Sequence, residues 1–297
     1  MKTKLSVIIV TYNQENKITK CLNSLLHSNT KDIELIVADD CSTDETEKIV
    51  RNWLGNNGSL FKGFNYLRNA ENKGTVVNIT NAISSSCGEY IKLIAGDDWF
   101  LEGALDLIKD FIETTDFDIA FSKVICVLEN NTGEITFEDE NPEYDNLEHF
   151  FELTPVEQFN FLAIRNRLPA PAAFFSRAFW DTIRLSNYQL KYIEDWAMWL
   201  LGSLKKSKFV FFDKALVIYL KHENSVTRKP TSKIYRQYLK DIVSTYRNIV
   251  LENKKALYFK NLFKVYLFFS LTKIACLLPL GFARTCMRIK NFALRKK

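Results

Sequence analysis

Three runs of β-branched and aliphatic residues stand in the first hundred positions, and each is followed by a polar segment and then by a helical pattern. They are residues 5–10 (LSVIIV), 33–38 (IELIVA) and 90–95 (YIKLIA). A strand that is apolar on both faces is typical of a parallel sheet covered by helices on each side. The alternation therefore predicts an α/β fold with a mostly parallel central sheet.

The rest of the chain continues this alternation and then becomes helical. The spacing of apolar residues predicts helices at 15–28, from 43 onwards, and at 76–83, 101–111, 178–183, 192–204 and 232–254. Further strands are predicted at 64–68, 119–128, 209–212 and 215–219. Residues 129–148 are acidic and poor in core residues, which favours a surface loop or hairpin.

Polar residues collect where the predicted strands end. Thr11 and Tyr12 follow the first strand, Asp39-Asp40 follows the second, and Asp97-Asp98 follows strand 90–95. Ligands of open α/β sheets bind at the carboxyl ends of the strands. The sequence therefore predicts a ligand site at this edge of the sheet.

The acidic pairs at that edge suggest a divalent cation. Adjacent carboxylates repel each other unless a proton or a cation holds them together. Mg²⁺ or Mn²⁺ bound by one or two carboxylates usually completes its shell with substrate phosphates. A third pair, Glu194-Asp195, comes almost a hundred residues later. The alternative for each pair is a solvated turn or helix cap.

Composition and short motifs exclude several classes of protein. With 47% hydrophobic residues in 297, the chain can bury a large core and is not disordered. It has no GxxxxGK[ST] loop, no GxGxxG after the first strand and no GxSxG elbow, which argues against P-loop kinases, dinucleotide-dependent dehydrogenases and serine hydrolases. The six scattered cysteines and the absence of a signal peptide indicate a reduced, cytosolic protein.

Six segments in fixed order resemble family-2 glycosyltransferases of the GT-A fold. The segments are VIIVTYN, IELIVADDCSTDET, NAENKG, YIKLIAGDDWF, IEDWAMW and YLKHENSVT. They are similar to the family's opening strand, its VVDDGSTDGT, N-x-G, DxD and ED segments, and its late Y-x-x-H-x-x-S segment. The resemblance covers residues 4–226. It implies a GT-A-like catalytic domain at 1–225, with a nucleotide-sugar-binding half at 1–128 and an acceptor-binding half at 129–225.

The resemblance also implies roles for the residues at the donor side. Tyr12, next to Thr11, is expected to stack on the nucleobase, since an aromatic face accepts any base. Asp40 is expected to accept the uracil imide N–H. Asp97 would contact the ribose, and Asp98, with His222 as a further ligand, would hold Mn²⁺ or Mg²⁺ beside the diphosphate.

On the acceptor side, the resemblance makes Asp195 the general base that takes the proton of the acceptor hydroxyl. Glu194 would orient Asp195 or bind the acceptor, and Trp196 would lie against the acceptor. The expected reaction is transfer of a sugar from a nucleotide-sugar donor, a UDP-sugar, to an acceptor hydroxyl with inversion. A lipid-linked glycan of a bacterial surface polysaccharide is the expected acceptor.

Two positions depart from the family pattern. Ala95 stands where the family often has the first Asp of DxD, so metal binding must rest on Asp97 and Asp98. Ile79 stands near the family's usual Arg, and Lys73 or Arg68 is the candidate substitute for its contact.

The charge is divided unevenly along the chain. From residue 221 onwards there are 18 Lys and Arg against three Asp and Glu, a net of +15, which leaves −10 on residues 1–220 within the overall +5. We expect residues 226–297 to be a helical extension on the inner face of the cell membrane. The apolar stretch 262–283 could instead span the bilayer or pack on the catalytic domain. No reader motif for nucleic acid is present.

Other functions stay open from the sequence. Ala95 at the degenerate motif is compatible with a non-catalytic protein that binds a nucleotide-sugar or a glycan. A nucleotidyltransferase would need a Gly-rich basic loop after the first strand, which Thr11-Tyr12-Asn13 does not resemble. A two-metal phosphotransferase or nuclease would need a denser set of carboxylates.

Overall fold

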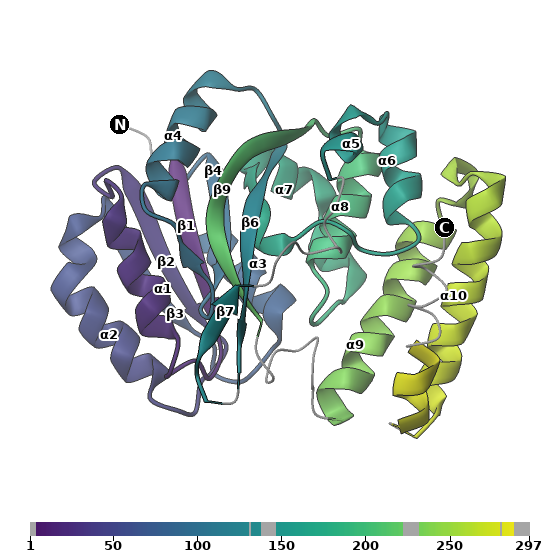
Figure 1. Ribbon diagram of the computed structural model, residues 1–297, viewed down its shortest axis with the longest axis horizontal. Coiled ribbons are helices and arrows are strands. Elements are labelled where there is room, and N and C mark those ends of the chain that lie inside the picture. The colour runs from purple at the N-terminus through teal and green to yellow at the C-terminus, as the bar shows by residue number, and fades with distance from the viewer. Residues whose placement is uncertain (1–3, 131, 138–146, 222–231, 280, 288–297) are drawn as a thin grey trace.

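A nine-stranded sheet with helices on both faces forms the centre of the computed structural model (Figure 1). The structure describes residues 4–130, 132–137, 147–221, 232–279 and 281–287. The strands are β1 (Leu5–Thr11), β2 (Ile33–Asp39), β3 (Gly63–Arg68), β4 (Tyr90–Ala95), β5 (Trp99–Phe100), β6 (Ile119–Glu129), β7 (Ile135–Phe137), β8 (Ala173–Ser176) and β9 (Phe209–Lys221).

The sheet has a parallel half and a mixed half. Its order is β3-β2-β1-β4-β8-β6-β9-β5, and β7 pairs with β6 outside this path. The first four strands in this order are parallel to one another, whereas β8 is antiparallel to both β4 and β6. Strand β9 runs parallel to β6. The prediction of an α/β fold is thus confirmed, and the parallel half contains the three runs that led to it.

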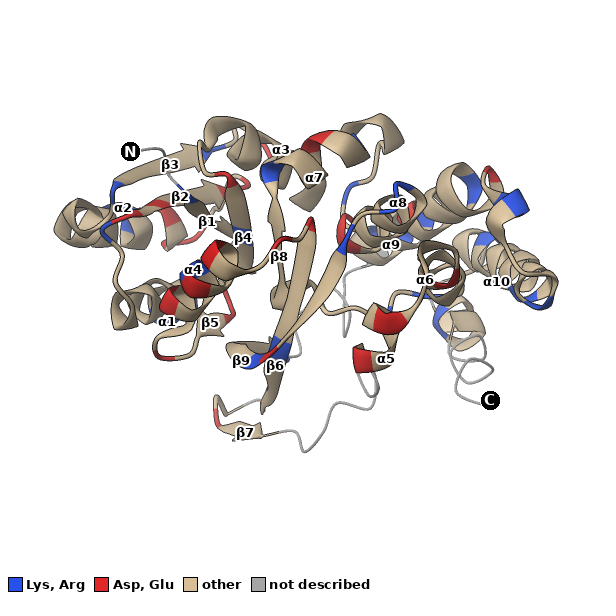
Figure 2. Cartoon of the chain, turned by 90° about the horizontal axis from the view of Figure 1, so that it is seen from above, with Lys and Arg blue, Asp and Glu red and all other residues tan. Residues whose placement is uncertain are grey.

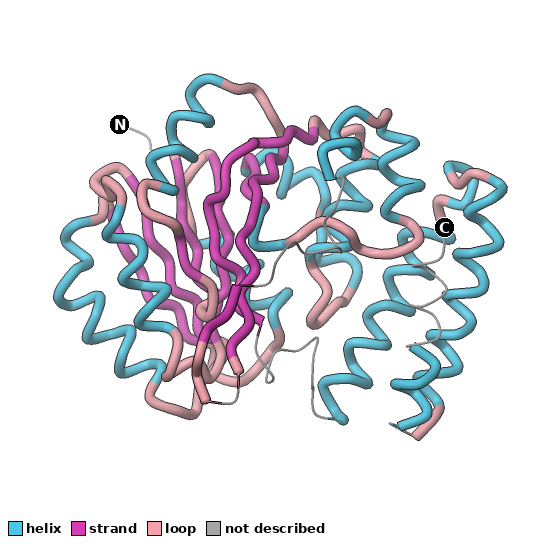
Figure 3. The backbone as a smooth tube through the Cα atoms, viewed as in Figure 1, coloured by secondary structure: helices cyan, strands magenta, loops and turns pink. Residues whose placement is uncertain are grey.

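The helices form layers on the two sides of this sheet (Figure 3). Their bounds are α1 (Ile18–Ser24), α2 (Thr46–Asn57), α3 (Thr75–Ser85), α4 (Ala104–Thr114), α5 (Leu147–Glu152), α6 (Pro155–Leu162), α7 (Arg177–Ile183), α8 (Asp195–Leu204), α9 (Ser232–Thr245) and α10 (Phe259–Leu277). A π-helical turn, Tyr246–Leu251, continues α9, and residues 281–287 are also helical.

The alternation of side chains along β1 explains why both faces are covered. Val7 and Ile9 face the core under α1, α2 and α4, while Ile8 faces the core under α3 and α8. All three side chains have no exposed surface. Because successive strand residues point to opposite faces, a run such as LSVIIV can be buried only between two helical layers.

Several elements differ from the sequence prediction. Strand β8 was not predicted, because Pro169 and Pro171 precede it and its four residues are too few for a clear pattern. The strands expected at 209–212 and 215–219 are one strand, β9, whose register against β6 shifts near Lys123. The exposed residues Asp213 and Lys214 lie at this irregularity, which is why they suggest a break in the sequence.

The C-terminal helices pack on the rest of the molecule rather than standing apart. Leu239 of α9 and Tyr246 are completely buried, and the Tyr246 hydroxyl donates to the Ile164 carbonyl at 2.6 Å. Helix α10 lies beside α9, at the end of the molecule opposite α2 (Figures 1 and 2), and buries Val265 and Phe268. The boundary predicted near residue 225 lies outside the described residues.

Candidate active site

The carboxyl ends of β1, β2 and β4 meet at one edge of the sheet. Thr11 of β1 is paired with Asp39 of β2, and Val10 is paired with Ala95 of β4. Beyond these pairs the Asp40 amide donates to the Thr11 carbonyl at 3.0 Å, and the Gly96 amide donates to the Val10 carbonyl at 2.9 Å. The polar residues that the sequence placed at three strand ends therefore come together at one site.

Asp40 is held in place by donors from the turn that precedes α3. Its Oδ1 accepts from the Lys73 amide at 2.8 Å and from Asn69 Nδ2 at 2.9 Å, and its Oδ2 accepts from the Gly74 amide at 2.7 Å. A carboxylate offers about four acceptor positions, so one position is left for a ligand donor. The 4% exposure of Asp40 limits that ligand to one that enters from the strand edge.

Gly74 allows this turn to approach so closely. Its φ is +91°, and a Cβ at this position would lie 2.3 Å from Lys191 Cγ and 2.8 Å from the Lys191 carbonyl oxygen. Both the backbone conformation and the space therefore require glycine here. The Asn72-Lys73-Gly74 turn seen in the sequence thus has a structural role, which is to bring the Lys73 and Gly74 amides onto Asp40.

Asp39, the first residue of the same acidic pair, has a different role. Its side chain is fully buried and accepts from the Ser42 amide, the Ser42 hydroxyl and the Tyr66 hydroxyl. Arg68 contacts Glu47 at 2.9 Å and donates to the Ser42 carbonyl. Asp39 therefore shapes the loop after β2, and Arg68 is engaged in the same loop.

The first strand ends in one buried and one exposed polar residue. Thr11 is buried, and its hydroxyl forms no hydrogen bond with the residues that the structure describes. Tyr12 is 42% exposed, which leaves its ring available to a ligand. Tyr192, which sequence reasoning missed, lies near Tyr12 and Asp40: burial raises the pKa of Tyr192, and the charge of Asp40 raises it further. Tyr192 is therefore a second aromatic side chain within electrostatic reach of Asp40.

Asp97 and Asp98 follow β4, but they are not equivalent. Asp98 is 1% exposed, and its Oδ1 accepts from the Leu220 amide of β9 at 2.9 Å. Burial, together with the charge of Asp97, raises the pKa of Asp98 well above its usual range. Asp97 is partly exposed. Asp97 is therefore the more accessible of the two to a bound cation, and the assignment of Asp97 to the ribose and Asp98 to the metal stays a prediction.

Glu194 and Asp195 stand at the start of α8. The Asp195 carboxylate accepts from Asn166 Nδ2 and from the Trp196 amide, both at 2.6 Å. Burial raises the pKa of Glu194 to about 8, and the charges of Asp195 and Asp241 add to this effect. Burial also raises the pKa of Asp195, but the two hydrogen bonds oppose the rise. The hydrogen bonds from Asn166 and Trp196 thus favour the ionised form of Asp195, while burial favours the protonated form of Glu194.

Tyr219 of β9 connects the two acidic pairs. Burial raises its pKa, and the charges of Asp98, Asp97 and Asp195 raise it further, so both acidic pairs act electrostatically on this phenol. Tyr219 stands in the late segment YLKHENSVT, which is the signal that could have identified it. Asn166 gave no such signal, because only the fold brings it to Asp195.

Three other sequence-predicted residues behave differently. The expected position of Trp196 on the acceptor surface needs correction. Its side chain is 4% exposed, its indole N–H donates to the Leu162 carbonyl, and its ring packs on Tyr246. Trp196 therefore belongs to the core around α8. His222 lies outside the described residues. The Lys73 side chain is exposed, and it is the candidate cation of the donor side, because Ile79 is buried and Arg68 is engaged elsewhere.

A cation could be held here by two carboxylates. Within the described part of the chain, no group of three or more His, Cys, Asp or Glu side chains gathers as a ready-made metal cage. One or two carboxylates are enough for Mg²⁺ or Mn²⁺ when substrate phosphates supply the other ligands. Asp97 and the second oxygen of Asp98 fit that arrangement, and a cation would relieve the repulsion between them.

Comparison with known proteins identifies the family of the chain. The profile described as glycosyl transferase family 2 matches residues 6–170. The GalNAc(5)-diNAcBac-PP-undecaprenol beta-1,3-glucosyltransferase of Campylobacter jejuni is 27% identical over 243 residues, which are 80% of this chain and 71% of that protein. The poly(ribitol-phosphate) beta-N-acetylglucosaminyltransferase TarS of Staphylococcus aureus is 31% identical over 142 residues, which are 47% of this chain and 24% of that protein.

Solved structures show the same fold. TarS residues 1–349 in complex with UDP-GlcNAc superimpose with a TM-score of 0.58 and 22% identity, over 85% of this chain and 69% of that chain. The mannosyltransferase PcManGT of Pyrobaculum calidifontis, in complex with GDP-Man and Mn²⁺, gives a TM-score of 0.57 at 14% identity, over 100% of this chain and 82% of that chain. The function must therefore be consistent with the ligand edge of the sheet, with the two acidic pairs and with these similarities.

Proposed function

The chain belongs to glycosyl transferase family 2, and from this premise we propose that it transfers a sugar from a UDP-sugar to an acceptor hydroxyl with inversion. The observation that carries the proposal is the presence of two acidic sites, with Asp97 and Asp98 after β4 on one side, where Asp98 accepts from the Leu220 amide of β9, and Asp195 at the start of α8 on the other. One side can hold the departing nucleotide, and the other can accept the proton of the incoming hydroxyl.

The donor would bind along the ends of β1 and β2. Tyr12 offers an exposed ring for stacking on the nucleobase, and Asp40 has one acceptor position left for the imide N–H of uracil. The buried Thr11 hydroxyl, which forms no hydrogen bond with the described residues, can bind a polar atom of the donor. Lys73, with its exposed ammonium group, can approach the phosphates.

Asp97, assisted by Asp98, would hold Mn²⁺ or Mg²⁺ at the diphosphate. When bound there, the ion supplies Lewis-acid assistance to the departing nucleotide. PcManGT, which has the same fold, was solved with Mn²⁺ and its sugar nucleotide, and this supports the choice of metal. His222, which lies outside the described residues, stays a candidate ligand.

Asp195 would be the general base. The hydrogen bonds from Asn166 and from the Trp196 amide fix its carboxylate and favour its ionised form. Glu194 keeps its proton beside it and can donate a hydrogen bond to the acceptor. One base and in-line displacement give inversion without a covalent intermediate, whereas a retaining mechanism would need a carboxylate nucleophile as well.

The acceptor we propose is a glycan linked to a lipid diphosphate, as in the synthesis of a bacterial surface polysaccharide. Arg165 and Arg167 flank Asn166, and the buried Nε of each lacks a hydrogen-bond partner. Burial, and to a lesser extent the like charge of Arg165, lowers the pKa of Arg167, whose guanidinium lies over the Phe161 ring. An anionic group of the acceptor would compensate these two positive charges. The Campylobacter relative, by its name, acts on an undecaprenol-linked glycan.

Such an acceptor would lie in a membrane, and α10 offers a surface for it. Phe259, Phe263 and Leu277 are 92%, 74% and 86% exposed, and Tyr266 and Ile274 lie on the same face of the helix. The opposite face is packed against α9. Exposed aromatic and aliphatic side chains with nearby lysines favour a helix that lies on the inner face of the cell membrane. Among the described helices, none has the length and apolarity to cross a bilayer.

A panel of nucleotide-sugars tests the proposal. The purified protein is incubated with each donor, with Mn²⁺, Mg²⁺ or EDTA, and the release of nucleotide is measured with and without a lipid-linked glycan. We expect release from one UDP-sugar, stimulation by the acceptor, loss in EDTA and restoration by Mn²⁺ or Mg²⁺. Donor binding without release for every donor and acceptor would favour the non-catalytic alternative that Ala95 suggested. Full turnover in excess chelator would remove the metal role.

A further inference from the structure

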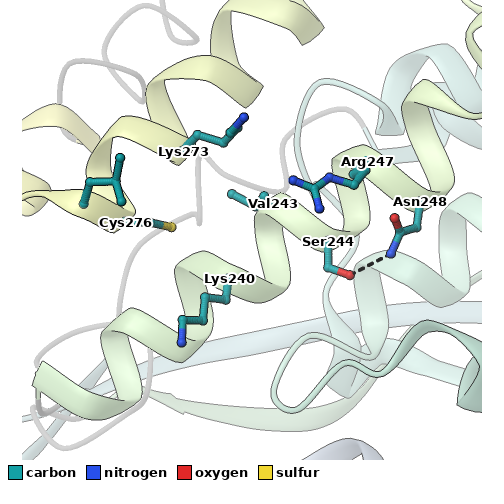
Figure 4. A pocket seen from close by; sticks show the side chains of 8 residues that line it. Lys240, Val243, Ser244, Arg247, Asn248, Lys273 and Cys276 are labelled. Carbon is teal, nitrogen blue, oxygen red and sulfur yellow. Dashed lines mark hydrogen bonds between the residues drawn. The ribbon is translucent and has the colours of Figure 1, made fainter.

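A cationic hollow lies between the two C-terminal helices, at the surface of the molecule (Figure 4). It has a volume of about 350 Å³. Three basic residues line it, which are Lys240 of α9, Arg247 of the π-helical turn and Lys273 of α10. Its apolar part is formed by Val243, Cys276 and Leu277, and Ser244 and Asn248 complete the lining.

The Lys273 ammonium lies over the Phe269 ring, 5.4 Å from its centroid, and the described acidic residues do not line this hollow. None of Lys240, Arg247 and Lys273 forms an ion pair with a residue that the structure describes. The acidic residue closest in sequence, Asp241, is buried on a neighbouring face of α9, where it accepts from the Lys191 and Tyr192 amides. Three positive charges around one cavity favour an anionic ligand.

The basic and apolar residues that line the hollow indicate which kind of anion it binds. A guanidinium group binds phosphate oxygens in a bidentate manner, and an ammonium group adds a point charge. The apolar floor formed by Val243, Cys276 and Leu277 would not contact a free inorganic anion favourably, but it can pack against the carbon chain of an amphiphile. Leu277 belongs both to this floor and to the exposed apolar face of α10, so the hollow opens beside the surface that faces the membrane in our proposal.

We propose that this hollow binds the phosphate headgroup of an anionic membrane lipid, with the lipid chains following the apolar face of α10. The inference rests on the proposed membrane contact of α10, and it adds a defined binding site to a contact that would otherwise be diffuse. The π-helical turn supports it, because such a turn is a widened segment that occurs often at functional sites, and here it carries Arg247 and Asn248.

Helix α9 would then connect the lipid to the active site. Lys240 faces the hollow, while the next residue, Asp241, holds the backbone of Lys191 and Tyr192 beside Asp40. A lipid bound on one face of α9 therefore fixes the orientation of the donor site beside the neighbouring face relative to the membrane.

Vesicle co-sedimentation of the full-length protein tests the site. The vesicles consist of phosphatidylcholine alone or of phosphatidylcholine with phosphatidylglycerol, and no nucleotide is present. The test variant is Arg247→Ala/Lys273→Ala. The matched control is Lys260→Ala/Lys264→Ala, which removes the same charge from exposed positions of α10 outside the hollow.

Diffuse attraction and a defined site predict different results. If the attraction is diffuse, each lost positive charge lowers the affinity for the vesicles about fivefold, so the affinity of both double variants would fall about 25-fold. With a defined site, we expect the test variant to lose at least ten times more affinity than the control, on vesicles that contain phosphatidylglycerol only. Equal losses in the two variants, or equal binding of the wild type to both kinds of vesicle, would overturn the proposal.

The failure of this site can be told apart from the failure of the proposed function. If the wild type binds neither kind of vesicle, the membrane contact and the lipid site both fall, while nucleotide release from the donor in solution is unaffected. If the wild type binds vesicles that contain phosphatidylglycerol but the two variants lose the same affinity, only the proposed lipid site is refuted. We expect both variants to keep the wild-type rate of nucleotide release, since none of the four residues lies at the acidic pairs.

Discussion

The proton on Glu194 gives a stability test of the acidic pair at the start of α8. Its pKa is raised from 4.5 to about 8 by burial, by Asp195 and by Asp241. Between pH 4.5 and 8 the folded protein therefore holds a proton that the unfolded chain has lost. A state that binds more protons is favoured at low pH, so the free energy of unfolding must fall as the pH rises through this window.

The shift sets the size of the effect. One pKa unit corresponds to about 1.4 kcal/mol, so the folded protein loses at most about 5 kcal/mol between pH 4.5 and pH 8 through this one group. The Glu194→Gln variant keeps the size and the hydrogen-bonding capacity of protonated Glu194 but cannot ionise. We expect the variant to equal the wild type at pH 5 and to be more stable at pH 9 by about 3 kcal/mol or more.

Urea unfolding at pH 5, 7 and 9 measures this difference. The matched control is Glu152→Gln, which changes an exposed glutamate of α5 and should alter the pH dependence little. A Glu194→Gln variant whose stability stays parallel to that of the wild type at all three pH values would refute the reasoning. Asp195 would then share its environment with an ionised neighbour, and its assignment as the only charged member of the pair would fail.

Two further predictions concern Asn166 and Gly74. Asn166→Ala removes the 2.6 Å hydrogen bond to Asp195, which is worth about 1.5–3 kcal/mol because its acceptor is charged. We therefore expect the acid limb of the kcat–pH profile to move up by about 1–2 pH units. A profile that does not move would show that this bond does not act on the base. Gly74→Ala should lower the free energy of unfolding in urea by about 2 kcal/mol or more and weaken UDP binding, because its Cβ would meet Lys191. Gly55→Ala in α2, where the Cβ would point into open space, is the control and should be neutral or stabilising. Equal behaviour of the two variants would contradict the account of the turn.

The sequence predicted the parallel half of the fold because its strands are long apolar runs. Strands β1, β2 and β4 are buried on both faces, and their polar ends mark the ligand edge directly. Strand β8 was missed because its position between β4 and β6 comes from tertiary pairing, and the sequence shows only a short apolar stretch after two prolines.

The site was predicted in part, for physical reasons of the same kind. Residues that follow a strand, such as Asp40 and Asp97, are visible in a sequence because the strand end positions them. Asn166 and Tyr192 lie in irregular segments and reach the site only through the fold. Burial could not be read from the segment IEDWAMW, so Trp196 was assigned to the acceptor although its side chain completes the core of α8.

The most direct test of the central claim is the turnover of Asp195→Asn with a UDP-sugar that the wild type uses. Asparagine keeps the size of the side chain but cannot accept a proton. We predict that kcat falls about 10²–10⁴-fold, while the Kd for UDP in calorimetry and the midpoint of urea unfolding change little. Retention of more than about a tenth of the wild-type kcat, with intact folding and UDP binding, would contradict the account and move the base to another residue.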